Sequence, residues 1–414
     1  MTDLVQQCER IARELGATYQ DLHRHPELSG TEQRTAGIAA AALRDAGFEV
    51  MTGIGGHGVV GILRNGPGET VWLRADMDGL PMAEATGLPY ASKEYGVDPS
   101  GERVPIAHAC GHDMHVTCLI GATTVLAATK ADWSGTVVAI FQPAEETLEG
   151  ARGMLDDGLA SRVPTPAVVL GQHVAPLPAG IVFYRPGAIL AAADDFEIVL
   201  HGAGGHASRP ETTVDPVVMA ASLILRLQTI VSRSLAAADA AVVTVGRVQA
   251  GTKDNIIPDF ATLNVTVRTF DPGVRTKVVA VLHRMVEAEA LAAGAPRDPE
   301  VTCTSSCPVT ANEPAATARV AEALAEGLGS GRVWESPRPG TGSEDFGLLG
   351  AAVGVPSVFW FLGGADPELF AGGGDPVRII ESLPSNHSPD YAPVIEPTLS
   401  TGIAALVAAA RGWL

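Results

Sequence analysis

Positive charge is scarce in this chain, which has 28 lysines and arginines against 47 aspartates and glutamates, a formal net charge of −19. A negative field of this kind repels phosphate backbones and anionic lipid surfaces, so we expect neither a nucleic-acid partner nor a membrane partner. The most apolar late stretch, residues 403–409, is far shorter than the roughly 20 residues of a membrane span. The N-terminal segment lacks the apolar core of a secretory signal. We therefore expect a cytoplasmic protein.

Cysteine is also scarce, with five residues in a chain of 414. An odd number of cysteines in a long chain does not indicate a disulfide framework. The hydrophobic fraction of 46% and the charged fraction of 18% are typical of a well-packed globular protein. Because single cores stop growing at roughly 250–300 residues, the length predicts more than one domain.

Helical and strand-like patterns alternate along most of the chain, which predicts an α/β architecture. The middle follows a different order, β-α-β-β-α, which predicts a small α+β domain with helices on one face of its sheet. We expect its elements near residues 196–200, 215–233, 241–248, 262–270 and 274–293. We therefore predict that residues 1–189 and 309–414 form one larger α/β domain. Residues 190–308 would be an inserted, ferredoxin-like domain.

Four apolar runs in the larger domain predict buried strands, at residues 71–73, 137–141, 167–170 and 355–362. Acids or a histidine follow three of them, namely Asp76 with Asp78, Glu145 with Glu146, and His173. In open α/β sheets, sites lie at the carboxyl ends of the strands. We therefore expect these polar side chains to converge.

The densest chemical signal is the segment His108–His115, HACGHDMH. Cys110 and His112 flank a glycine that permits a tight turn, so their side chains can point the same way and reach one metal ion. A thiolate and an imidazole together favour zinc. The alternative is a loop cluster of histidines around a buried free cysteine, but so many metal-type side chains in so short a segment disfavour it.

Glu145 and Glu146 are adjacent carboxylates just beyond a predicted strand. Consecutive side chains there point to different sides, so one can bind metal while the other faces a water molecule. Activation of water for amide hydrolysis requires this division of tasks. The alternative is a solvated acidic turn. Taken singly, His173 and His387 are weaker signals, because a lone histidine is more often structural.

The chain resembles the M20 metallopeptidase family, in the amidohydrolase branch that contains hippurate hydrolases and indole-acetyl-amino-acid hydrolases. The resemblance rests on segments in family order over nearly the whole chain: Asp21–Ser29, Arg74–Pro81, His108–His115, Gln142–Glu146, Gly171–His173, Gly204–Pro210, Asn255–Pro258, Gly342–Phe346 and Asn386–Pro389. Together these motifs are very specific, although each alone is moderate.

The resemblance implies a site with two divalent metal ions. Its ligands would be Cys110 in a bridging position, His112, Glu146, His173 and His387. Zinc is favoured because of the thiolate, and manganese is the alternative. Glu145 matches the general base. Asp78 resembles an acid that orients a ligating histidine, with a solvated turn as the alternative, and Asp76 receives no role.

The inserted domain would act as a lid and dimerisation domain. His206 matches a histidine that polarises the scissile carbonyl, in its own or a partner subunit. Arg268 lies on the face of its predicted strand opposite the apolar residues, and with Asn255 it resembles a clamp for the substrate carboxylate. The alternatives are a loop histidine and an exposed strand arginine. A homodimer is one assembly that the resemblance implies, beside monomers and tetramers.

The implied activity is metal-dependent hydrolysis of the amide bond of N-acyl or N-aroyl amino acids, which gives a carboxylic acid and a free amino acid. The hypothesis is that a metal-bridged hydroxide attacks the carbonyl with Glu145 as general base. A dipeptidase or an N-acetyl-amino-acid deacetylase is the alternative within the family. A non-catalytic homologue that binds metal or a small molecule is disfavoured, because all five ligand positions and the base are intact.

Overall fold

The computed structural model describes residues 2–414 and contains two compact units. The larger unit comprises residues 2–189, Ala311–Pro339 and Asp345–Leu414, and the smaller one Leu190–Thr310 and Gly340–Glu344.

The prediction had assigned residues 309–310 and 340–344 to the larger domain, whereas the structure places them in the smaller unit. The reason is local bonding that the sequence pattern does not reveal. Ala191 N donates to the carbonyl of Gly342, and the Thr310 hydroxyl and the Cys307 thiol both donate to the carbonyl of Glu344.

The larger unit is built on an eight-stranded sheet with the order β1-β2-β6-β3-β7-β18-β8-β17. Its strands are β1 (Glu49–Ile54), β2 (Gly58–Asn65), β3 (Thr70–Asp76), β6 (Gly135–Gln142), β7 (Val168–Pro178), β8 (Val182–Tyr184), β17 (Val333–Glu335) and β18 (Ser357–Ala365). The central strands β6, β3, β7 and β18 run parallel and are almost wholly buried. They overlap the four predicted apolar runs, and their shared direction brings their carboxyl ends to one edge of the sheet.

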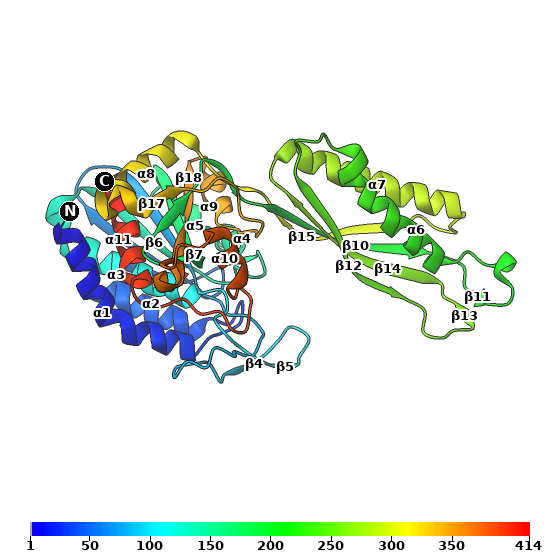
Figure 1. Ribbon diagram of the computed structural model, residues 1–414, viewed down its shortest axis with the longest axis horizontal. Coiled ribbons are helices and arrows are strands. Elements are labelled where there is room, and N and C mark those ends of the chain that lie inside the picture. Colours follow the sequence, from blue (N-terminus) through cyan, green and yellow to red (C-terminus); the bar gives the residue numbers. More distant parts are fainter. Residues whose placement is uncertain (1) are drawn as a thin grey trace. The chain divides into compact units, whose positions relative to one another are not determined.

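Helices cover this sheet, and Figure 1 shows α1, α3 and α11 close to one another in the larger unit. The helices are α1 (Thr2–Arg24), α2 (Gln33–Asp45), α3 (His112–Ala128), α4 (Gly150–Asp156), α5 (Leu159–Arg162), α8 (Pro314–Leu328), α9 (Gly347–Val353), α10 (Pro376–Ser382) and α11 (Thr398–Arg411). Short β-ribbons add β4 (Tyr95–Val97) with β5 (Arg103–Pro105), and β9 (Gly187–Leu190) with β16 (Thr310–Asn312). Because α3 is buried along most of its length, its first turn is held rigidly against the sheet.

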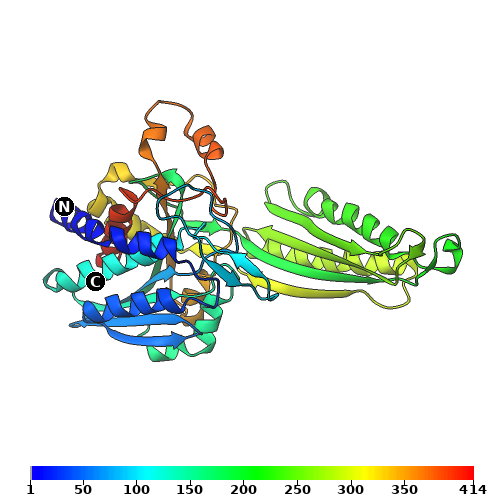
Figure 2. The same ribbon diagram turned by 90° about the horizontal axis from the view of Figure 1, so that it is seen from below.

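The smaller unit is a four-stranded antiparallel sheet, in the order β12-β14-β10-β15, with two helices on one face (Figures 1 and 2). Its elements are β10 (Ala192–His201), α6 (Pro216–Thr229), β12 (Ala241–Ala250), β14 (Phe260–Thr269), α7 (Pro272–Ala293) and β15 (Glu300–Cys307). Asp215 and Asp271 cap the two helices through their carboxylates. Strand β15 completes a βαββαβ order, which is the ferredoxin-like arrangement.

Residues Pro216–Ser234, which comprise α6 and a short π-helical turn, are long and apolar enough to cross a membrane by length and composition. However, Met219, Leu223 and Leu227 of this helix are buried in the core of the smaller unit. Core helices of water-soluble proteins pass the same length test, so this is weak evidence for a membrane span.

Candidate metal centre

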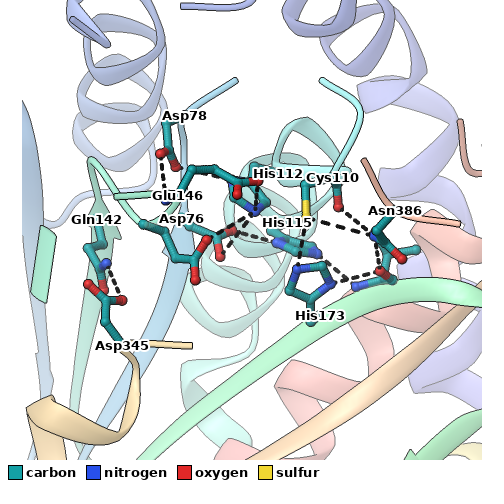
Figure 3. Close-up of polar contacts among 12 residues, drawn as sticks. Asp76, Asp78, Cys110, His112, His115, Gln142, Glu146, His173, Asp345 and Asn386 are labelled. Carbon is teal, nitrogen blue, oxygen red and sulfur yellow. Dashed lines mark hydrogen bonds and ion pairs between the residues drawn. The ribbon is translucent and has the colours of Figure 1, made fainter. Parts of the chain in front are cut away.

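The first turn of α3 depends on Gly111, the N-cap residue, which has a φ of 82°. A Cβ atom at this position would lie 2.4 Å from a methyl group of Val174, so only glycine fits there. This tight turn brings Cys110 and His112 to the same side, beside the carboxyl ends of β3 and β6 (Figure 3). The predicted convergence of motifs on this edge of the sheet is therefore observed.

The five predicted metal ligands form two groups of three that share Cys110. The ligand atoms of Cys110, His112 and His173 lie within 4.8 Å of one another, and so do those of Cys110, Glu146 and His387. In the first group, the Cys110 thiol lies 3.4 Å from His173 Nε2. In the second, His387 Nε2 lies 3.2 Å from Glu146 Oε2. A sulfur atom shared between two triplets is the arrangement expected of a bridging ligand.

The donor atoms fit divalent cations. Within residues 2–414, His112 Nε2 and Glu146 Oε1 are buried without a hydrogen-bond partner, and they lie 3.8 Å apart. Buried polar atoms without partners are rare unless an ion or water satisfies them. Burial and the neighbouring His115 hold the pKa of His173 well below its ordinary value, so this imidazole is neutral, as a ligand must be. Burial also raises the pKa of the Cys110 thiol, and a bound cation would favour the thiolate instead.

Asp78 orients His112. Its Oδ1 lies 3.1 Å from His112 Nδ1, and its Oδ2 accepts hydrogen bonds from Ser29 Oγ (2.7 Å) and from Glu146 N (2.9 Å). Burial alone would raise the pKa of Asp78, but the hydrogen bond with His112 keeps it below its ordinary value. The carboxylate is therefore ionised and holds the ring proton on Nδ1, which leaves Nε2 to face the cluster.

Two other ligand positions are held by backbone contacts. His173 Nδ1 donates to the carbonyl of Val174 at 2.7 Å, so its Nε2 points toward Cys110. His387 has a left-handed φ of 68°, and its N–H donates to the carbonyl of Ala109. Its side chain is 55% exposed, which shows that solvent reaches the cluster on this side.

Glu145 and Glu146 both reach the ligand cluster. Glu145 Oε2 and Glu146 Oε1 each lie 3.8 Å from His112 Nε2, and Glu146 Oε2 lies 3.2 Å from His387 Nε2, so the two carboxylates converge on the cluster rather than point to different sides. The turn before them is set by Ala144, which has a φ of 52° and whose N–H donates to Glu32 Oε1 at 2.8 Å. Glu145 therefore lies beside the ligand cluster, so its carboxylate could reach a water molecule bound at the cluster.

Next to the predicted ligands lies a buried network of polar side chains that the sequence did not predict. Arg74 donates to Asp76, to Gln142 and to Asp345. Asp76 also contacts His115, and Gln142 donates to Asp345 (Figure 3). Asp76 had received no role, and His115 had been noted only as part of the HACGHDMH segment. The signal that could have identified His115 is its position three residues after His112 on a helix, which places both on one face.

From the sequence, Asn386 also received no role, although this residue directly precedes the predicted ligand His387. Its Nδ2 donates to the carbonyls of Cys110 and Val174, both at 3.1 Å. This side chain therefore links the loop before α3 to β7 beside two predicted ligands.

In the smaller unit, His206 lies on the ribbon of β11 (Gly205–His206) and β13 (Ile256–Ile257), and Asn255 adjoins it, because its carbonyl accepts from the N–H of Ala207 at 3.2 Å. The Ser208 N–H donates to His206 Nδ1 at 3.1 Å. Because Nδ1 accepts this bond, the ring proton lies on Nε2, and His206 presents a hydrogen-bond donor on an exposed ribbon.

Arg268 lies elsewhere in the smaller unit. It pairs with Ala193 at one end of β14 and donates to Ser343 Oγ. The other end of β14, at Phe260, is eight residues or about 27 Å away and adjoins the ribbon that carries Asn255. The predicted clamp of Asn255 with Arg268 is therefore not assembled within one chain, because Asn255 lies beyond the Phe260 end of β14 and Arg268 lies near its other end.

Known proteins are similar to this chain over most of its length. Residues 72–376 match peptidase family M20/M25/M40. The chain is 38% identical to the hippurate hydrolase of Campylobacter jejuni, over 79% of this chain and 82% of the relative. It is 37% identical to the N-acetylcysteine deacetylase of Bacillus subtilis (83% and 86% covered) and to thermostable carboxypeptidase 2 of Saccharolobus solfataricus (83% and 84%).

Solved structures show the same fold. The YXEP protein of Bacillus subtilis, described as a dinuclear metal binding peptidase from the M20 family, superposes with a TM-score of 0.77 at 30% identity, over 98% of this chain and 99% of the other. A protein from methicillin-resistant Staphylococcus aureus gives a TM-score of 0.84 at 29% identity, with 98% of each chain covered. The family match and these relatives agree with the ligand triplets that have Cys110 in common and with the paired glutamates. This chain is a hydrolase of peptidase family M20/M25/M40, in its amidohydrolase branch.

Proposed function

We propose that this enzyme hydrolyses the amide bond of N-acyl or N-aroyl amino acids and releases a carboxylic acid and a free amino acid. The observation that carries the proposal is the pair of ligand triplets that share Cys110, with Glu145 directly beside them. Relatives named for hippurate and N-acetylcysteine, each at least 37% identical, act on substrates of this class.

We further propose that the two triplets hold two zinc ions, because a thiolate and imidazoles are the ligands that zinc prefers. Bound divalent ions supply Lewis-acid chemistry, which polarises a carbonyl and acidifies water. The residues that would hold them are Cys110, His112, Glu146, His173 and His387. Manganese is the other candidate, and metal analysis of the purified protein would separate the two. All five cysteines of the chain are free thiols, which supports a reducing, cytoplasmic location.

The protein side chains divide the remaining tasks. Glu145 accepts a proton from the attacking water and delivers it to the leaving amine nitrogen. His206 donates a hydrogen bond from its Nε2–H group to the carbonyl oxygen as negative charge develops there, and keeps its proton. Arg268 binds the substrate carboxylate with its planar guanidinium group.

A homodimer would reconcile these tasks with the separation of Asn255 and Arg268 along β14. We propose that His206 and Asn255 of one copy serve the site of its partner. Strand β12 supports this assembly, because it is an edge strand of the sheet and carries Val242 and Val248, each 49% exposed. Unpaired edges of this kind readily add another strand.

The decisive test replaces Glu145 with Gln, which keeps the side-chain shape and removes the base. We expect two metal ions per chain to remain bound while turnover of hippurate and N-acetyl amino acids falls about 10²–10⁴-fold. Glu149→Gln is the matched control, since Glu149 is a solvent-accessible acid in the same segment and its replacement should leave turnover unchanged. Undiminished activity in Glu145→Gln would refute the assigned role.

A peptidase is the second candidate, because the carboxypeptidase of Saccharolobus solfataricus is as similar as the deacetylase. A panel of hippurate, N-acetyl amino acids, a long-chain acyl-glutamine and a dipeptide, assayed by amine release after chelation and metal addition, distinguishes the two. Release from the dipeptide alone would identify a peptidase.

A further inference from the structure

We propose that Asp76 and His115 are positioning residues for His173, and that they act through the backbone of the residue that follows it. The inference rests on the proposed function, in which His173 binds a metal ion. Both side chains are fully buried, and neither belongs to the five proposed ligands.

The first part of the geometry fixes the tautomer of His115. The N–H of Val174 donates to His115 Nε2 at 2.7 Å, so that nitrogen must be an acceptor. The ring proton therefore lies on Nδ1, which is 2.5 Å from Asp76 Oδ1 and donates to it. Asp76 is held in turn by Arg74, whose Nη1 donates to Asp76 Oδ2 at 2.7 Å. Hydrogen bonds are therefore donated from Val174 to His115 and from His115 to Asp76, and Arg74 donates to the other oxygen of the same carboxylate.

The second part explains why β7 requires this support. Strand β3 pairs with β7 only as far as Gly171, so beyond that point the edge of β7 that faces β3 has no strand partner. A buried N–H without an acceptor is strongly disfavoured. His115 supplies the acceptor for Val174, and Asn386 Nδ2 donates to the Val174 carbonyl at 3.1 Å.

The third part connects this backbone to the ligand. The Val174 carbonyl also accepts the Nδ1 proton of His173 at 2.7 Å, and the His173 Nε2 then lies 3.4 Å from the Cys110 thiol. The N–H and the carbonyl of Val174 belong to the two peptide groups on either side of its Cα, so a shift of the Val174 backbone would displace the carbonyl that orients the His173 ring toward Cys110. His115 therefore sets the direction of a proposed ligand that it does not hydrogen-bond itself.

The competing explanation is that His115 serves only as a hydrogen-bond donor to the buried Asp76 carboxylate. Two amide replacements separate the explanations, because they reproduce different ring nitrogens. In His115→Gln, the amide oxygen can reach the Nε2 position and accept from Val174. In His115→Asn, the amide nitrogen reproduces Nδ1 and donates to Asp76, but nothing accepts from Val174.

The experiment measures zinc stoichiometry by elemental analysis, zinc affinity by chelator competition, and the Tm of the metal-free proteins. We expect His115→Gln to keep near-wild-type affinity and His115→Asn to lose about 10–100-fold for one ion. Asp76→Ala should lose a similar amount, because His115 can then move its proton to Nε2. Equal affinities in both His115 variants, or a greater loss in His115→Gln, would overturn the inference.

The same measurement separates failure of the inference from failure of the proposed function. Wild-type protein that binds no zinc or other divalent ion would refute the proposed metal centre itself. Wild-type protein that binds two ions, with both His115 variants equal to it, would refute only the positioning role. A lower metal-free Tm shared by both variants, without a difference in affinity, would show that His115 is merely structural.

Discussion

Replacement of Asp78 by Asn would test how the metal centre is oriented. Asp78 Oδ2 accepts from Ser29 and from the N–H of Glu146, so the amide oxygen of Asn would remain on that side. The amide nitrogen would then face His112 Nδ1 across 3.1 Å. Two N–H donors cannot face each other, so His112 would move its proton to Nε2, the nitrogen that should bind metal.

The magnitude follows from the bond that is lost. A hydrogen bond to a charged group contributes about 1.5–3 kcal/mol. In the variant, His112 either loses this hydrogen bond at Nδ1 or carries its proton on Nε2, where the metal ion must displace it. In both cases metal binding should weaken by about the same free energy. Because about 1.4 kcal/mol is a factor of ten, we expect metal affinity to fall roughly 10–100-fold, in line with the loss observed when residues behind metal ligands are replaced.

Chelator competition with the purified variant measures this loss directly, and turnover at saturating metal should recover in part. Ser29→Ala is the matched control, because it removes a different hydrogen bond to the same carboxylate without changing the partner of His112. We expect less than a tenfold effect from it. Wild-type metal affinity in Asp78→Asn would refute the proposed orientation of His112.

Two further predictions concern pH and assembly. His23 contacts Asp113 at 2.6 Å and Glu84 at 3.0 Å; burial alone would lower its pKa, but these carboxylates raise it from 6.5 to about 10. Protonated His23 stabilises the folded state, and this contribution is complete below pH 6.5 and is lost as the pH rises through 10. The free energy of unfolding of the metal-free protein should therefore fall across this window, by at most about 5 kcal/mol. Denaturant titrations at several pH values measure this fall, which should be smaller in His23→Gln; an identical pH dependence in the variant would exclude His23 as its source. For assembly, His206→Ala and Glu145→Gln chains should each be inactive, and their mixture after subunit exchange should recover turnover if His206 serves the partner's site. No recovery, with mixed dimers verified by mass spectrometry, would place His206 in its own site.

The sequence by itself determined the fold class and the composition of the site. Apolar runs at residues 71–73 and 137–141 predicted buried strands, because a strand with both faces covered needs no alternation of apolar and polar residues. The tight spacing of Cys110 and His112 indicated a metal site, because a short turn around glycine leaves their side chains few directions. Gly47 likewise follows the end of α2, where its φ of 80° lets the chain turn toward β1.

Only the tertiary structure decided which polar groups act on one another. The chain positions of Asp76, His115 and Val174 carry no signal of their hydrogen bonds, because those bonds depend on where β3 stops pairing with β7. The separation of Arg268 from Asn255 has a similar cause, since both are polar residues near one strand and their distance depends on which end of β14 each adjoins. Local spacing determines the chemistry that a short segment can perform, whereas contacts between distant segments depend on strand register and packing, which no single segment encodes.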